Sequence, residues 1–313
     1  MTEALPILLH PVVALLYALT AWLCFPQARQ ASSAARHVNA LVALALLLHA
    51  IGLGRAIFTP TGVDLSFTHA LSLVAGLAVL IAWATGLIRA LPAVGAVVLP
   101  VAAVAAVLPV MGESARRLPY ANVPWASVHI TIALCAYAIL IVAAAEALVL
   151  TGIERRLHRA LPNPGVAASP PLLTLERWLF LLIGIGYVLL TLTVASGIFY
   201  SSELFGTPAR FNQKNVFAVA AWATYTALLV GRWRYGWRGR RALKWILAGT
   251  LLLLAAYVGS KFVLEVLQVS GIRNQESGIS CVASRQPAHS TPIYRPTSNV
   301  HRRTNGVTRD RLC

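Results

Sequence analysis

Charged residues are scarce in this sequence. Only 12% of its 313 residues are Asp, Glu, Lys or Arg, whereas a soluble domain carries about 25%. Hydrophobic residues make up 58% of the chain, and the mean hydropathy is +0.71. This composition excludes an ordinary soluble globular protein and predicts an integral membrane protein.

Cysteine and the common catalytic motifs are also scarce or missing. The four cysteines are isolated from one another and form no C-x-x-C pair, which excludes a thiol relay or a cysteine zinc site: Cys24, Cys135, Cys281 and Cys313. No phosphate-binding loop, H-E-x-x-H, G-x-S-x-G or pair of carboxylates is present. The sequence therefore predicts a binding or assembly factor and not an enzyme such as a hydrolase or ATP-driven pump.

Long apolar runs dominate the chain instead. A membrane-spanning helix needs about 20 mainly apolar residues. Eight stretches approach this length, and they predict an all-α, polytopic membrane helical bundle of about eight transmembrane helices. The stretches are Leu5–Phe25, Val38–Phe58, Phe67–Ile88, Val94–Met111, Trp125–Gly152, Trp178–Tyr200, Val216–Val230 and Trp245–Leu267.

The basic residues indicate how these spans are oriented. The net charge of +16 sits between the spans and in the tail, so it indicates topology and predicts no nucleic-acid partner. The odd-numbered loops hold thirteen Lys and Arg residues against four in the even-numbered loops. We therefore expect a multi-pass protein of the bacterial inner membrane with both termini in the periplasm.

The composition changes abruptly after the last span. Residues 269–313 hold few apolar residues and show no periodicity, which predicts a basic, disordered tail. Residues 1–268 are predicted to form the membrane domain.

Aromatic residues concentrate in the stretch from Ile198 to Lys214, before the seventh span. Phe199, Tyr200, Phe205 and Phe211 lie within thirteen residues of one another. We interpret this stretch as an amphipathic loop that offers a surface to a flat apolar ligand or to the lipid interface.

This stretch and the following span resemble the cytochrome c assembly proteins of the CcsA and CcmC type. Their loop ends in W-x-W-D-P-K, which aligns with Ala209 to Lys214, so that Phe211 takes the place of the second Trp and Lys214 is identical. Trp222 and Tyr225 match the W-x-x-Y of the next span, and Gly236–Gly239 matches its glycine-tryptophan turn. The resemblance extends over roughly residues 1–268 and is closest to the YpjD-like or HemX-like eight-span branch.

The resemblance implies haem handling, with haem b as cofactor. His129, in a W-x-x-x-H start with Trp125, matches the family's outer-face axial haem ligand, whereas two further family histidines map near Val230 and Lys261. His10, His49 and His69 are expected at the same membrane depth as His129, and a neutral imidazole can ligate haem iron. Each histidine could instead hydrogen-bond a neighbouring helix or lie in the headgroup zone.

The predicted cofactor-binding set is His129, His49, His69, His10, Trp125, Phe211, Lys214 and Trp222, with His129 on the iron. The expected partners are haem, the lipid bilayer and other cytochrome c assembly components or apocytochrome c. Two other functions stay open, because a fold does not determine a function. The chain could be a transporter that kept the fold without haem, or a scaffold or regulator acting through its basic loops.

Overall fold

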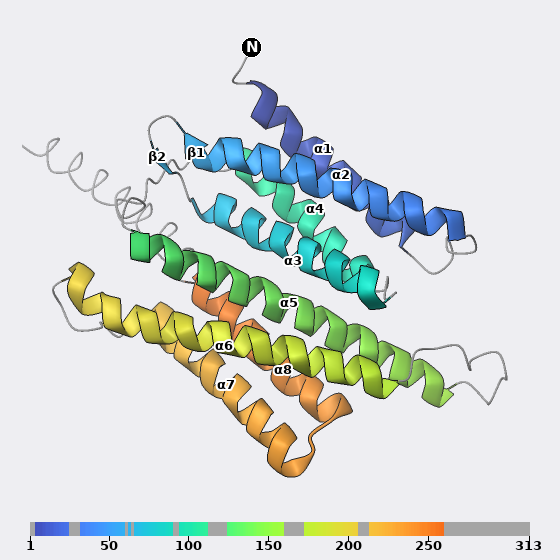
Figure 1. Ribbon diagram of the computed structural model, residues 1–313, viewed down its shortest axis with the longest axis vertical. Helices are drawn as coiled ribbons and strands as arrows, with labels where there is room; N and C mark the ends of the chain where they lie inside the picture. The colour runs from blue at the N-terminus through green and yellow to red at the C-terminus, as the bar shows by residue number, and fades with distance from the viewer. Residues whose placement is uncertain are drawn as a thin grey trace, which may run out of the picture. The chain divides into compact units, whose positions relative to one another are not determined.

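A computed structural model describes residues 4–24, 32–59, 62–63, 66–89, 94–111, 124–159, 172–205 and 213–259. These residues form eight α-helices and belong to one compact unit (Figure 1). The helices are α1 (Ala4–Leu23), α2 (Ser32–Ile57), α3 (Phe67–Arg89), α4 (Gly95–Met111), α5 (Pro124–Arg159), α6 (Leu172–Phe205), α7 (Gln213–Tyr235) and α8 (Gly239–Leu254). A π-helical turn, η3 (Ala255–Gly259), continues α8, and two short antiparallel strands, β1 (Phe58–Thr59) and β2 (Gly62–Val63), follow α2.

The predicted all-α membrane bundle is confirmed. Five helices in the described part of the chain, within α2, α3, α5, α6 and α7, are long and apolar enough to cross a membrane. The apolar parts of α1 and α4 are shorter. The tail 269–313 lies outside the described residues, so its disorder stays a prediction.

The prediction of a loop from Ile198 to Lys214 is wrong at both ends of that stretch. Helix α6 continues to Phe205, and α7 begins at Gln213. The sequence holds no glycine or proline between Ile198 and Phe205, so nothing there stops the helix before Gly206. Because α6 extends to Phe205, the aromatic residue Phe199 belongs to a helix and not to a loop. Residues 206–212 lie outside the described part.

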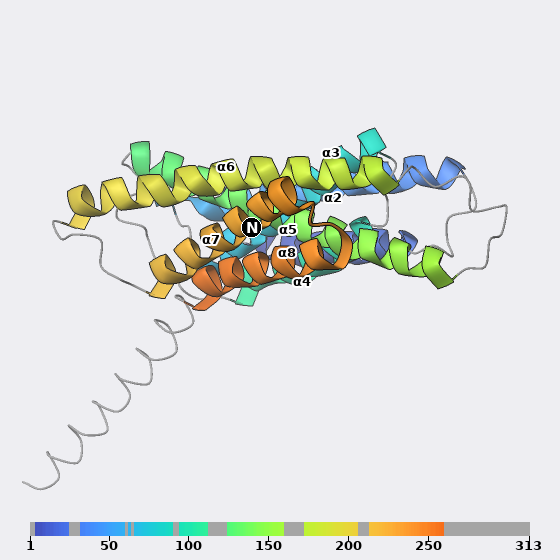
Figure 2. The same cartoon turned by 90° about the horizontal axis from the view of Figure 1, so that it is seen from below.

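The eight helices pack as two groups of four, each continuous in sequence. In the first group α1 contacts α2 and α4, and α3 contacts α2 and α4. In the second group α5 contacts α6 and α8, and α7 contacts α6 and α8. Helices α5 and α6 run alongside each other in both views (Figures 1 and 2).

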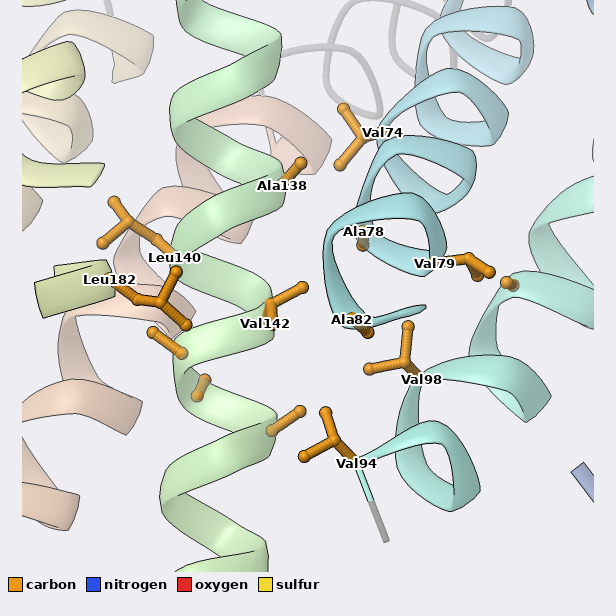
Figure 3. Close-up of a cluster of buried hydrophobic side chains, with 14 of the residues drawn as sticks. Val74, Ala78, Val79, Ala82, Val94, Val98, Ala138, Leu140, Val142 and Leu182 are labelled. Carbon is orange, nitrogen blue, oxygen red and sulfur yellow. The ribbon is translucent and has the colours of Figure 1, made fainter. Parts of the chain in front are cut away.

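The two groups meet where α3 and α4 pack on α5. Small apolar side chains fill this contact, among them Val74 and Ala78 of α3, Val98 of α4, and Ala138 and Val142 of α5 (Figure 3). Helix α5 is the central element. Of its most apolar stretch 56% is buried inside the protein, whereas the same share is 22–33% for the other four long apolar helices. It touches both groups and so joins the bundle together.

The bundle has two ends, named here by a residue that lies at each. The His129 end is where α2, α4 and α6 finish and where α3, α5 and α7 begin. The Arg232 end is the opposite one, where α7 turns into α8 (Figure 1).

Candidate functional site

His129 lies just over one turn into α5 and is held by a serine of α6. Its Nδ1 lies 2.7 Å from the Ser196 hydroxyl, which in turn donates to the backbone carbonyl of Leu192 at 2.7 Å. The tautomer of His129 decides which of the two groups donates. When the single serine proton bonds a backbone carbonyl, that of Leu192 at 2.7 Å or Thr193 at 3.2 Å, the hydroxyl accepts a hydrogen bond from Nδ1–H of His129. This bonding favours the imidazole tautomer that carries its lone pair on Nε2, the tautomer that binds a metal through Nε2.

The surface around His129 is apolar and open. Phe199 of α6 is 74% exposed, and Ile198 of α6 and Val128 of α5 are also exposed. A Cβ added at Gly197 would lie 3.5 Å from Cε1 of His129, in ordinary van der Waals contact, so this glycine of α6 adjoins the imidazole ring. A half-buried imidazole beside exposed apolar side chains offers a nitrogen ligand and an apolar surface, the two features with which a protein can hold a haem.

Trp125 and Tyr137 share one side of α5 with His129, four residues before it and eight residues after it. Trp125 is half-buried at the start of the helix. The Tyr137 ring lies 6.0 Å from the Tyr257 ring of the π-helical turn. On this face of α5, one aromatic residue therefore precedes His129 and another follows it, as the sequence predicts.

His49 is placed differently, as a bridge between three helices. Its Nδ1 lies 3.0 Å from the Tyr17 hydroxyl of α1, and its Nε2 lies 2.9 Å from the Ser72 hydroxyl of α3. The side chain is buried, and Gly76 leaves room for its ring. Both ring nitrogens are therefore engaged in holding α1, α2 and α3 together, as expected of a polar residue inside a membrane bundle.

His10 and His69 lie in the same group of helices as His49. His10 is buried, and it is close enough to both His69 and His49 for their charges to interact. Nδ1 of His69 lies 2.7 Å from Ser66, whose hydroxyl also accepts a long hydrogen bond from the His69 backbone N–H and so caps α3. The structure thus brings His10, His49 and His69 together within the first group of helices, whereas His129 bonds to α6 in the second.

The W-x-x-Y pair of α7 joins that helix to both of its neighbours. The indole N–H of Trp222 donates to Thr191 of α6 at 3.0 Å, and its ring stacks on Tyr187. The Tyr225 hydroxyl lies 2.8 Å from Thr250 of α8. Trp222, predicted to bind the cofactor, therefore contacts α6 in this structure.

The structure describes little of the two remaining predicted residues, Phe211 and Lys214. Phe211 lies outside the described residues, and only the backbone of Lys214, in the first turn of α7, is described. Among the residues that the structure describes, no group of three or more His, Cys, Asp or Glu side chains could hold a metal ion. A haem iron needs only axial ligands, so a single oriented imidazole is a sufficient protein donor on the His129 side.

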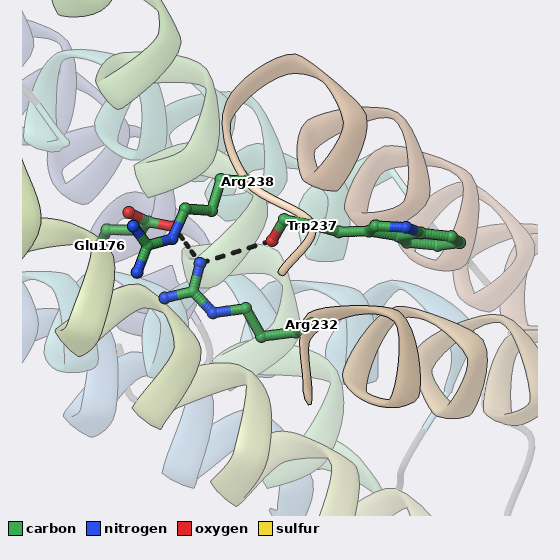
Figure 4. Close-up of polar contacts among 4 residues, drawn as sticks. All are labelled: Glu176, Arg232, Trp237 and Arg238. Carbon is green, nitrogen blue, oxygen red and sulfur yellow. Dashed lines mark hydrogen bonds and ion pairs between the residues drawn. The ribbon is translucent and has the colours of Figure 1, made fainter. Parts of the chain in front are cut away.

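A charged cluster that the sequence did not reveal holds the Arg232 end together. Arg232 of α7 donates to Glu176 of α6, and Nε of Arg238 lies 3.5 Å from the same carboxylate oxygen (Figure 4). Arg232 also donates to the Trp237 carbonyl at 3.4 Å, and its guanidinium lies 4.2 Å from the Phe180 ring centroid. One carboxylate thus joins α6, α7 and the turn between α7 and α8.

Replacing Glu176 with glutamine is expected to lower the free energy of unfolding by about 1–3 kcal/mol, the scale for removing a partner from a charged hydrogen bond. The amide keeps one acceptor but loses the charge that offsets two adjacent guanidinium groups. Thermal unfolding in detergent measures the loss, and Arg234→Gln, at an exposed residue of α7, is the control. An equal midpoint for Glu176→Gln and wild type contradicts the role of this cluster.

Comparison with known proteins identifies the family. The model of the family described as cytochrome C assembly protein matches residues 37–268. The chain belongs to the cytochrome c assembly family. It is a multi-pass membrane protein, and the relationship predicted from Lys214, Trp222 and Tyr225 is confirmed.

Individual relatives place the chain near the YpjD proteins within the cytochrome c assembly family. It is 40% identical over 147 residues to the inner membrane protein YpjD of Escherichia coli K12, covering 46% of this chain and 54% of the relative. It is 27% identical over 212 residues to the cytochrome c biogenesis protein CcsA of Thermosynechococcus vestitus, covering 54% of this chain and 66% of that protein. The alignment with YpjD spans only about half of either chain, and no solved structure matches.

Proposed function

We propose that this protein binds haem at the His129 end of the bundle, with Nε2 of His129 as an axial ligand of the iron. The observation that carries the proposal is the Ser196 hydrogen bond, which favours the metal-binding tautomer of His129 beside exposed apolar side chains. Membership of the cytochrome c assembly family and the name of the relative CcsA support the same function.

The residues of this chain would divide the work. His129 would supply the nitrogen ligand, Ser196 would fix its tautomer and ring orientation, and the exposed Phe199 would cover part of the macrocycle. Bound haem would supply the iron centre. This chain would hold the haem without catalysing a reaction on it. The sequence has no C-x-x-C-H attachment motif, so the haem would be held without covalent bonds, as haem b.

We further propose that the His129 end faces the periplasm and that the protein lies in the bacterial inner membrane. The Arg232 end exposes Arg234, Arg238, Arg240 and Arg241, the excess of basic residues that marks a cytoplasmic face. In this orientation the site would present or retain haem on the outer side, within reach of other assembly components or apocytochrome c.

Absorption spectra test this function. The full chain is purified in detergent from haem-replete cells, its oxidised and reduced spectra are recorded, and any haem-free fraction is titrated with haem. A Soret band at one haem per chain is the expected result. A folded protein without a Soret band, even after haem is added, overturns the proposal and favours the transporter or scaffold alternative.

Replacing Ser196 with alanine is expected to weaken haem binding about 10- to 100-fold, the usual effect of losing an outer-shell partner of a ligating histidine. The iron would keep His129 as its ligand, so a Soret band should remain. Because the ring would lose the partner that orients it, the Soret band should shift and haem should dissociate faster. Stopped-flow transfer of haem to apomyoglobin measures the dissociation rate.

Two further variants separate orientation of the ligand from general packing. Ser196→Thr keeps a hydroxyl and should restore slow dissociation, whereas Thr131→Val alters a hydroxyl on α5 that bonds only its own helix backbone in the contacts described. If Ser196→Ala releases haem no faster than Thr131→Val, then Ser196 does not position the ligand.

A further inference from the structure

An apolar groove runs between α2 and α3 on the first group of helices. Its volume is about 390 Å³, and it is open on one side. Ala43 and Trp83 lie at one end, and Leu53 and Leu73 lie at the other. Ten residues separate the ends along each helix, so the groove is about 15 Å long.

Trp83, which lines this groove, carries an unsatisfied hydrogen-bond donor. Its indole Nε1 is buried and has no hydrogen-bond partner among the described residues, and Trp83 itself lines the groove. A buried N–H without an acceptor is costly, and such groups are rare in native structures. Protein atoms cover Nε1 in this arrangement, so a ligand with an acceptor oxygen at the Trp83 end would satisfy this donor after the indole turns toward the groove.

A cation lies beyond the same end of the groove. Arg36 is exposed near the start of α2, seven residues before Ala43, and it therefore shares the helix face that carries Ala43, Leu47 and Ala50 into the groove. The separation along the helix axis is about 10 Å. From the helix end inward, the order is a positive charge, a hydrogen-bond donor and a long apolar wall.

We propose that this groove binds one glycerophospholipid molecule as a specific ligand. Its phosphate would pair with Arg36, an ester carbonyl would accept the hydrogen bond of Trp83, and one acyl chain would fill the groove. These three features of the lipid occur in the same order as the three features of the protein. The groove length also matches half of a hydrocarbon core about 30 Å thick, the reach of one acyl chain.

Comparing two lipids with the same headgroup tests the role of Trp83. Delipidated full-length protein is titrated with dioleoyl phosphatidylglycerol and with its diether analogue, which lacks both ester carbonyls, and binding is followed by native mass spectrometry. Wild type should bind the diester about fivefold more tightly, the effect of one hydrogen bond. Trp83→Phe should bind the two lipids equally, and Trp22→Phe, at an exposed tryptophan of α1, should keep the preference.

Further variants keep the proposal testable if Trp83→Phe does not fold. Arg36→Gln should weaken the binding of both lipids, and Ala50→Leu should also weaken both because it fills the groove. Equal binding of the diester and diether lipids by wild type overturns the contact with Trp83. Retention of an isoprenoid quinone in place of a phospholipid overturns the identity of the ligand.

Discussion

His129→Ala is expected to abolish the Soret band of the purified protein. The substitution removes the imidazole nitrogen that would bind iron and leaves the Ser196 hydroxyl without its partner on α5. Because loss of an outer-shell partner alone lowers affinity about 10- to 100-fold, loss of the ligand itself should exceed a hundredfold. Absorption spectra of equal amounts of folded wild type and variant measure the change.

His49→Ala is the informative counterpart. Both ring nitrogens of His49 are hydrogen-bonded, to Tyr17 and Ser72, so its loss should lower the unfolding midpoint and leave the Soret band in place. Added imidazole should restore part of the band to His129→Ala by occupying the space of the lost ring. A spectrum unchanged in His129→Ala and lost in His49→Ala would move the iron ligand to the first group of helices.

Gly249→Ala is expected to destabilise the second group of helices by about 2–3 kcal/mol, the upper part of the usual range for overpacking. A Cβ at this position would lie 2.7 Å from Cε2 and 2.9 Å from Cζ of Tyr225. The Tyr225 ring is fully buried, and its hydroxyl bonds to Thr250, so it has little freedom to move aside. The midpoint of thermal unfolding in detergent should therefore fall clearly.

Gly184→Ala, in α6 of the same group of helices, provides the matched control. Among the described residues, no atom outside its own helix lies within 4 Å of the added Cβ, so the substitution should be neutral or slightly stabilising, because alanine favours a helix. If the two substitutions change the midpoint equally, the effect at Gly249 is one of helix propensity and not of contact with Tyr225.

Long apolar runs made most of the helices predictable. Helices α3 and α4 lie within one residue of their predicted bounds, because loops with proline, glycine or charge border the apolar run. Helix α6 was predicted to end too early because a helix can continue beyond the apolar run that identifies its span. Hydropathy does not reveal the additional residues up to Phe205. The only sign of them in the sequence is the lack of a helix-breaking glycine or proline.

The site was predictable only in part. His129 could be selected because Trp125 and Tyr137 recur on its face of the helix, and because the resemblance points to it. Ser196 could not be selected, since it is separated from His129 by 67 residues and looks like any small residue of a membrane helix. The same holds for the contact between Glu176 and Arg232, which depends on how α6 and α7 pack.

The arrangement in two groups has a consequence for how the protein is made. Residues 4–111 supply the first group and residues 124–259 the second, and the chain is synthesised from its N-terminus. The first four helices can therefore insert and assemble before α5 leaves the ribosome. Until then, lipid covers the face of α3 and α4 that later meets α5. The Val and Ala side chains of that face are as compatible with acyl chains as with a protein core. The first four helices can therefore remain in the bilayer, without a chaperone on that face, until α5 is synthesised.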